Sequence, residues 1–181
     1  MKYLLLILLT LYCFSSQAQD IVLKKVTRLN FLNPGVEYEF PLNKNSTLST
    51  NAGIGYHGSY MNLTKYTPNG FIYMISPFLD IEYRKIFNRD RRLKKGTNLK
   101  YNSGNYLGAR FLTRGKEISS NIVRTDNVDF SIGPVWGLQR AYGRLHLLFD
   151  IGPVYYFDTK GNSGIFPFMI QLNIGLNLKQ S

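Results

Sequence analysis

Polar and apolar residues alternate along most of the chain beyond its first 20 residues. In the stretch HLLFDIGPVYYF, residues 146–157, every second side chain from Leu147 onward is apolar, whereas the alternate positions include His146, Asp150 and Gly152. Successive side chains of a β-strand point to opposite faces, so this pattern predicts a strand with one apolar and one mixed face. The same alternation recurs in residues 32–42, 47–60, 71–87, 105–114, 127–139 and 166–179.

These seven predicted strands are long. They run for roughly 10 to 17 residues, whereas strands of soluble proteins average about 5 to 6 and a membrane-crossing strand needs about 9 to 11. Closed bacterial membrane barrels use an even number of strands. Either residues 21–31 or residues 117–125 could supply the eighth, and the pattern leaves this choice open. The first choice would place the short turns at 42–47 and 140–144, and also the long connection 88–102, on the periplasmic side.

Four prolines fall on the apolar face of the predicted strands. Pro34, Pro77, Pro134 and Pro153 all fall on the apolar face, where the alternation continues through them. Proline removes a donor from the ladder of hydrogen bonds and avoids central strands. We therefore expect bulges or bends at these positions.

The polar face distinguishes a barrel in lipid from a soluble one. It is rich in glycine and carries charged residues, while the lysines gather in the turns. Small residues beside a few opposite charges suit a narrow lumen, in which side chains must fit and neutralise one another. The expected luminal network comprises Glu37, Glu39, Asp80, Glu82, Arg84, Arg110, Asp129 and Asp150. Within it, Asp150 should face Arg84, Arg110 or Arg114. Aromatic residues near the ends of the apolar face are typical of the girdles at a membrane interface.

The N-terminus, MKYLLLILLTLYCFSSQAQD, predicts export. A short basic start, an apolar run and a small-residue cleavage site indicate a cleaved signal peptide over residues 1–18, followed by one barrel domain over 19–181. The apolar run is too short to span a membrane as a helix. Cys13 is the only cysteine and lies within it, so the mature chain can form neither a disulfide nor a thiolate metal site.

Basic residues outnumber acidic ones by 22 to 11, a formal charge of +11. The run NRDRRLKKG concentrates Arg89, Arg91, Arg92, Lys94 and Lys95 in one connection. We interpret it either as a solvated turn or as an anion-binding segment for lipid phosphates or lipopolysaccharide. Nucleic acid is not expected, because no aromatic residues are interleaved for base stacking.

Catalytic signals are weak. His57 and His146 lie on the polar face without neighbours at metal-ligand spacing, and no known catalytic or phosphate-binding motif occurs. We expect no enzyme activity, cofactor or metal.

The signal peptide, the glycine-rich alternating strands, the aromatic ends and a strand that runs to the C-terminus together resemble the small outer-membrane β-barrel (porin-like) proteins of Gram-negative bacteria. In the terminal stretch QLNIGLNLKQS, Asn173, Gly175 and Leu178 partly match the signal that such barrels present to the outer-membrane assembly machinery, although the usual terminal aromatic is missing. The resemblance implies an all-β, antiparallel up-and-down transmembrane barrel of about eight strands. It also implies a location in the outer membrane, in contact with lipid and lipopolysaccharide.

Three functions remain open from the sequence. The favoured one is a non-enzymatic outer-membrane barrel with a structural or adhesive role, or with weak solute passage. The alternatives are a barrel enzyme that acts on envelope lipid and a soluble periplasmic barrel that binds an apolar ligand.

Overall fold

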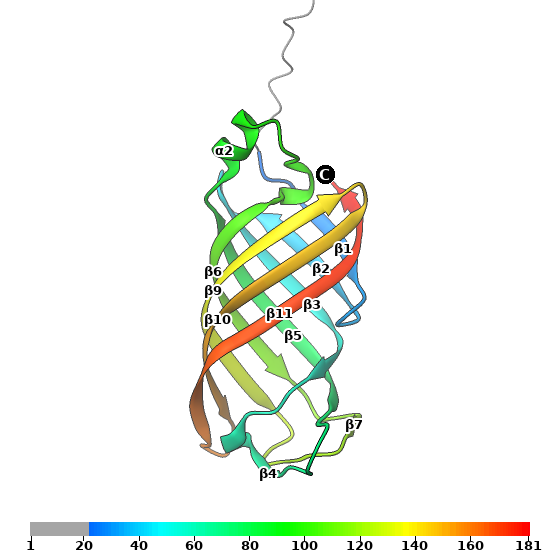
Figure 1. Ribbon diagram of the computed structural model, residues 1–181, viewed down its shortest axis with the longest axis vertical. Helices are drawn as coiled ribbons and strands as arrows, with labels where there is room; N and C mark the ends of the chain where they lie inside the picture. The colour runs from blue at the N-terminus through cyan, green and yellow to red at the C-terminus, as the bar shows by residue number, and fades with distance from the viewer. Residues whose placement is uncertain (1–21) are drawn as a thin grey trace, which may run out of the picture.

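The chain forms an all-β fold, with 63% of the described residues in strands and 8% in helices. A computed structural model describes residues 22–181, so the predicted signal peptide and Cys13 lie outside the described residues. Eight strands form a closed antiparallel ring, in which each pairs with the next in sequence, β11 pairs with β1, and β3 pairs with β5 (Figure 1). They are β1 (Val26–Asn30), β2 (Gly35–Pro41), β3 (Ser46–His57), β5 (Met74–Ile86), β6 (Gly104–Arg114), β9 (Asp129–Tyr142), β10 (Leu145–Asp158) and β11 (Ser163–Gln180). The predicted all-β antiparallel class and the count of eight strands are confirmed.

The eighth strand comes from the first of the two candidate segments. β1 occupies residues 26–30 and joins β11 to β2. The other candidate, residues 117–125, contributes only two short pieces. β7 (Ser119–Ser120) adds to β5, and β8 (Val123–Arg124) pairs with β4 (Thr64–Tyr66) in a separate small sheet.

The two ends of the ring differ. The terminal end holds the C-terminus, the turns at 42–45 and 143–144, and the connection 87–103 with α2 (Arg89–Lys94) and the 3-10 turn η2 (Lys100–Asn102) (Figure 1). The loop end holds the connections 58–73, 115–128 and 159–162. The sequence pattern predicted no helix, because the six residues of α2 make fewer than two turns and are too few for a helical period to show. Within residues 22–181, no helix is long and apolar enough to cross a membrane.

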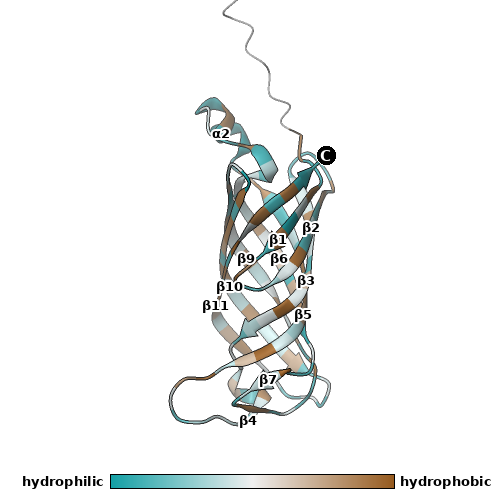
Figure 2. Cartoon of the chain, turned by 90° about the vertical axis from the view of Figure 1, so that its right-hand side faces the viewer, coloured by the Kyte–Doolittle hydropathy of each residue, from teal (hydrophilic) through white to brown (hydrophobic). Residues whose placement is uncertain are grey.

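Polar residues face the interior of the ring and apolar residues face outward. Val36, Ile132 and Tyr155 expose about half of their surface (53%, 48% and 47%), whereas Glu37 and Asp150 are 2% and 0% exposed. Along single strands the hydropathy switches from residue to residue (Figure 2). The mixed face of the sequence pattern is therefore the inner face.

The prolines disturb the sheet at only some of the predicted positions. Pairing between β10 and β11 shifts at Pro153, and the β9–β10 ladder is interrupted beside Pro134, so the sheet is irregular there. Gly152 allows β9 to approach β10 closely at this point, because an added Cβ would lie 2.0 Å from the carbonyl oxygen of Pro134. At Pro77 the predicted bulge is wrong, because β3 and β5 stay in register and the β5–β6 ladder ends at the adjacent residue. Pro34 lies in the β1–β2 turn, outside both strands.

Candidate functional site

The interior of the ring holds a network of ion pairs, and Glu37 is its hub. One oxygen of Glu37 accepts hydrogen bonds from Arg28 Nη1 (2.9 Å), Arg84 Nη1 (2.8 Å) and Ser49 Oγ (2.8 Å). The three charged side chains come from β1, β2 and β5. Arg28 Nη2 also binds Glu39, at 2.5 Å. Two arginines thus share one carboxylate that is cut off from water.

Arg110, from β6, organises the next layer. Its Nη1 and Nη2 donate to the two oxygens of Asp150 at 2.7 and 2.8 Å, and its Nε donates to Asp80 Oδ1 at 3.1 Å. The sequence predicted Arg84, Arg110 or Arg114 as the partner of Asp150, and in the structure the partner is Arg110. Glu82 connects this layer to the hub, because its Oε2 lies 3.4 Å from Arg110 Nη2 and 2.8 Å from Arg84 Nη2.

A third, separate cluster lies toward the loop end. Asp129 accepts from Arg114 at 2.7 and 3.0 Å and from Arg124 Nη2 at 2.6 Å. Arg124 also pairs with Glu117 at 3.3 Å, and Arg114 Nη1 donates to the carbonyl of Gly58 at 2.7 Å. Asp129 therefore pairs outside the network that holds the other seven predicted luminal residues.

Removing one partner of a buried ion pair costs about 3 to 5 kcal/mol, because the other charge stays uncompensated. Removal of any single member of the network should therefore be strongly destabilising. Tyr106 adds a hydrogen bond from its hydroxyl to Asp150 Oδ2 at 3.3 Å. Gly137 makes room for this ring, since an added Cβ would lie 2.4 Å from Tyr106 Cζ.

The connection 87–103 closes the terminal end of the ring. Tyr101 and Asn102 both adopt left-handed backbone conformations, with φ of 54° and 58°. This geometry directs two carbonyls into the ring: that of Tyr101 accepts from Arg28 Nη2 at 3.0 Å, and that of Asn102 accepts from Gln139 Nε2 at 2.7 Å. Such conformations cost about 1 to 3 kcal/mol each, a cost that hydrogen bonds to a buried charge can offset.

The five basic residues of the predicted anion-binding segment do not share one face. Arg89 is buried, at 3% exposed, and Arg92 Nη2 donates to the carbonyl of Asn98 at 2.6 Å. Arg91, Lys94 and Lys95 are the more accessible three. An anion from solvent would therefore meet three of the five cations.

A window interrupts the wall of the ring on the side of β1 and β2. The β1–β2 turn ends partway down, where Phe31 N donates to the Ile174 carbonyl (2.8 Å) and Ile54 N donates to the Pro34 carbonyl (2.9 Å). Beyond these bonds β11 and β3 face each other without a strand between them, because β11 pairs with β1 only from Gly175 onward. The segment 58–63 crosses below the gap and completes its border.

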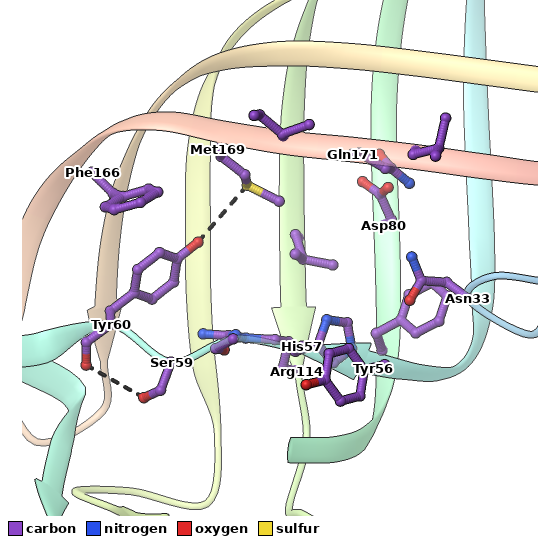
Figure 3. A pocket seen from close by; sticks show the side chains of 15 residues that line it. Asn33, Tyr56, His57, Ser59, Tyr60, Asp80, Arg114, Phe166, Met169 and Gln171 are labelled. Atoms are coloured by element: carbon purple, nitrogen blue, oxygen red, sulfur yellow. Dashed lines mark hydrogen bonds between the residues drawn. The ribbon is translucent and has the colours of Figure 1, made fainter. Parts of the chain in front are cut away.

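A cavity of about 280 Å³ lies behind this window. Figure 3 shows Phe166, Met169 and Gln171 along β11, with Tyr60 reaching from the lower border; the Tyr60 hydroxyl contacts the Met169 sulfur at 3.8 Å. Toward the interior the cavity is lined by His57, Asp80 and Arg114. It thus joins an apolar rim to a polar floor.

Sequence reasoning missed the arginines Arg28 and Arg124, the Glu117 partner of Arg124, and the window. Arg28 was overlooked because its strand was one of two open candidates, although it alternates with Thr27 and Leu29 as an inward residue should. Arg124 gave no signal, since β8 has only two residues. The window depends on where a turn stops relative to strands that are distant in sequence.

The described residues include no cluster of histidine, cysteine or acidic side chains that could hold a metal ion. Nε2 of both His57 and His146 lacks a hydrogen-bond partner, and the His146 nitrogen lies 4.0 Å from Glu37, too far for a hydrogen bond. The charged side chains of the interior are engaged in ion pairs with one another.

Comparisons with known proteins identify no relative: no family model matches this chain, and neither does any curated protein or solved structure.

Proposed function

We propose that this chain is a transmembrane β-barrel of the bacterial outer membrane with a sealed interior and a non-enzymatic, structural or adhesive role. The observation that carries the proposal is the inversion of polarity, with apolar side chains outward and paired charges inward. A soluble protein rarely exposes apolar patches beyond a few hundred Å². A barrel in lipid requires an outward apolar band and tolerates a polar interior.

A sealed interior is favoured over solute passage. The ion pairs from Arg28 to Asp150 cross the ring from β1 to β10, and the carbonyls of Tyr101 and Asn102 close the terminal end. A narrow barrel of eight strands is filled by its own side chains. Of the roles that the sequence left open, weak solute passage is therefore the less favoured.

Exposed apolar side chains at the loop end support a role in contact with other surfaces. Met61, Phe71 and Ile118 are 88%, 76% and 64% exposed. In outer-membrane barrels the longer loops face the cell exterior. We place the loop end outside the cell and the terminal end, with Arg91, Lys94 and Lys95, in the periplasm, near inner-leaflet lipid head groups.

The test is fractionation of cells that express the full chain, followed by a gel mobility assay with and without boiling. We expect the chain in the outer membrane, with a heat-sensitive mobility typical of a folded barrel, and no current steps in planar bilayers. Recovery in the soluble periplasm would overturn the membrane assignment. Regular conductance steps would overturn the sealed interior, and an altered lipid A profile would favour the enzyme alternative.

A further inference from the structure

We infer that the window between β3 and β11 is a binding site, open to the lipid side, for a single-chain amphiphile with an uncharged, hydroxyl-bearing head of the monoacylglycerol type. This inference rests on the proposed membrane location and adds a ligand to it. It starts from the unpaired edge of β11. Residues 163–172 include no buried residue, although buried and less buried residues alternate from Asn173 to Asn177.

An open strand edge within a membrane is costly. Each backbone N–H or C=O group that lacks a hydrogen-bond partner in lipid costs several kcal/mol of free energy. Irregular strand edges are therefore tolerated only where they line a polar or water-filled space. The cavity behind the window provides such a space at membrane depth. The edge of β11 is thus better suited to a polar, hydrated occupant on its inner side than to bulk lipid.

The rim of the window matches an acyl chain. Tyr56, Phe166 and Ile170 line the cavity and are 47%, 45% and 60% exposed, so they continue the outward apolar surface into the opening. Ligand pockets usually measure about 300 to 1,000 Å³, and a cavity of about 150 Å³ already holds benzene. The 280 Å³ found here fits part of one chain and is too small for two chains side by side.

The floor of the cavity selects the head group. Asp80 uses Oδ1 for Arg110, and its other oxygen accepts no hydrogen bond from the described residues. His57 Nε2 also lacks a partner. One hydroxyl group of a polyol head can donate to the Asp80 carboxylate, and another can donate to or accept from the imidazole.

The charge of the interior disfavours an anionic head. The buried arginines and carboxylates number six and seven, an excess of one negative charge when all are ionised. Arg114 lines the cavity but already binds Asp129, and Arg110, which contacts the lining residue Asp80, already binds Asp150. A fatty-acid carboxylate would find no free cation there and would face Asp80.

The experiment uses the mature full chain in phosphatidylcholine vesicles with a diazirine derivative of monododecanoylglycerol, followed by mass spectrometry of the photolabelled peptides. We expect label within residues 54–60 and 163–174, displaced by unmodified monododecanoylglycerol. Dodecanoate, in its ionised form, should compete about tenfold more weakly, the effect of roughly 1.4 kcal/mol from an unfavourable charge.

Two variants and one control sharpen the result. Met169→Trp should fill the window and reduce labelling about tenfold, since it occupies the space without touching the ion pairs. Asp80→Asn should erase the preference for the hydroxyl head over the carboxylate. Ile132→Trp, on the outward face of β9, is the control and should be photolabelled to the same extent as the parent chain. A reduced labelling of this control would show a general effect of added aromatic surface.

Insertion is measured in the same vesicles by protease protection, which separates the two proposals. An inserted chain that labels evenly around the ring, or equally in Met169→Trp, overturns the window site and leaves the membrane proposal standing. A chain that stays soluble overturns the membrane proposal. The probe is then applied in solution below its aggregation limit, where label at the window supports the site and its absence overturns it.

Discussion

β10 and β11 are neighbours in the same ring, yet their surroundings differ. β10 pairs with β9 on one side and with β11 on the other, and its buried and less buried residues alternate from end to end. β11 pairs with β10 over Ser163–Leu176 but with β1 only over Gly175–Gln180, and the alternation begins at Asn173. Both sequences alternate in hydropathy. A strand therefore shields its inner face only where both of its edges have neighbours.

The two halves of the ring also differ in energetics. Beside β1 and β2 the wall is complete and the ion pairs are sealed from water. Between the β1–β2 turn and the loop end the wall is open. The polar atoms nearest this opening include His57 Nε2, which has no hydrogen-bond partner among the described residues. The closed half should therefore depend strongly on each ionic residue, whereas the open half should tolerate changes and accept ligands.

The largest expected effect comes from the hub of the closed half. Glu37→Ala leaves Arg28 and Arg84 without their shared carboxylate and should lower the free energy of unfolding by about 3 to 5 kcal/mol. Glu117→Ala, whose side chain is 26% exposed beside Arg124, is the matched control and should cost less than about 1 kcal/mol. Urea titration of both variants in vesicles gives the comparison. Equal losses would mean that water reaches the hub.

Two outward isoleucines at the same level test the window directly. Ile151 and Ile170 are partners in the β10–β11 register. Ile151→Arg should cost about 2 to 4 kcal/mol if it meets the middle of the bilayer. Ile170→Arg should cost less, because an arginine at the rim can turn toward Asp80. Folding yield and unfolding free energy in vesicles measure both, and a larger penalty at Ile170 would contradict an open window.

Removing exposed cations from either end of the ring tests whether α2 and its C-cap bind anionic lipid. Changing Arg91, Lys94 and Lys95 to Gln should weaken binding to anionic vesicles by about 1 kcal/mol per residue, an effect that added salt should diminish. Changing Lys65, Lys116 and Lys160 to Gln removes the same charge from the loop end. If both triple variants lose the same affinity in cosedimentation, net charge alone explains the binding and the segment is a solvated turn.

The smallest expected effect lies in the loops. The hydrogen bond from the Thr159 hydroxyl holds the pKa of Asp126 below its usual 3.8. A lowered folded-state pKa stabilises the loop above the unfolded pKa, and this contribution is lost as the pH falls through the folded-state value. Thr159→Val should therefore raise the pKa of Asp126 toward 3.8, as an NMR titration of the carboxyl can measure. An unchanged pKa would mean that the backbone donors suffice.

The sequence by itself determined the class of fold and the alternation of its faces. Period-two alternation identified seven of the eight ring strands, because strand geometry forces every second side chain to one face. Charges and glycines on the mixed face indicated a narrow polar interior, and seven of the eight luminal residues named from the pattern join one network. Chain export and a membrane location remain predictions.

Only the tertiary structure determined which side chains form ion pairs and hydrogen bonds inside the ring. Asp150 could face any of three arginines by parity. The register places Tyr106 in line with Asp150 through Gly137, and Arg110, four residues further along β6, reaches the carboxylate with its long side chain. Segment 87–103 closed one end of the ring through two carbonyls whose direction depends on left-handed backbone at Tyr101 and Asn102. The window arose because the β1–β2 turn stops short of the ends of β3 and β11. These contacts join residues far apart in the chain, 40 positions for Arg110 and Asp150 and 73 for Arg28 and Tyr101. Local periodicity carries no information about the spacing between such distant segments.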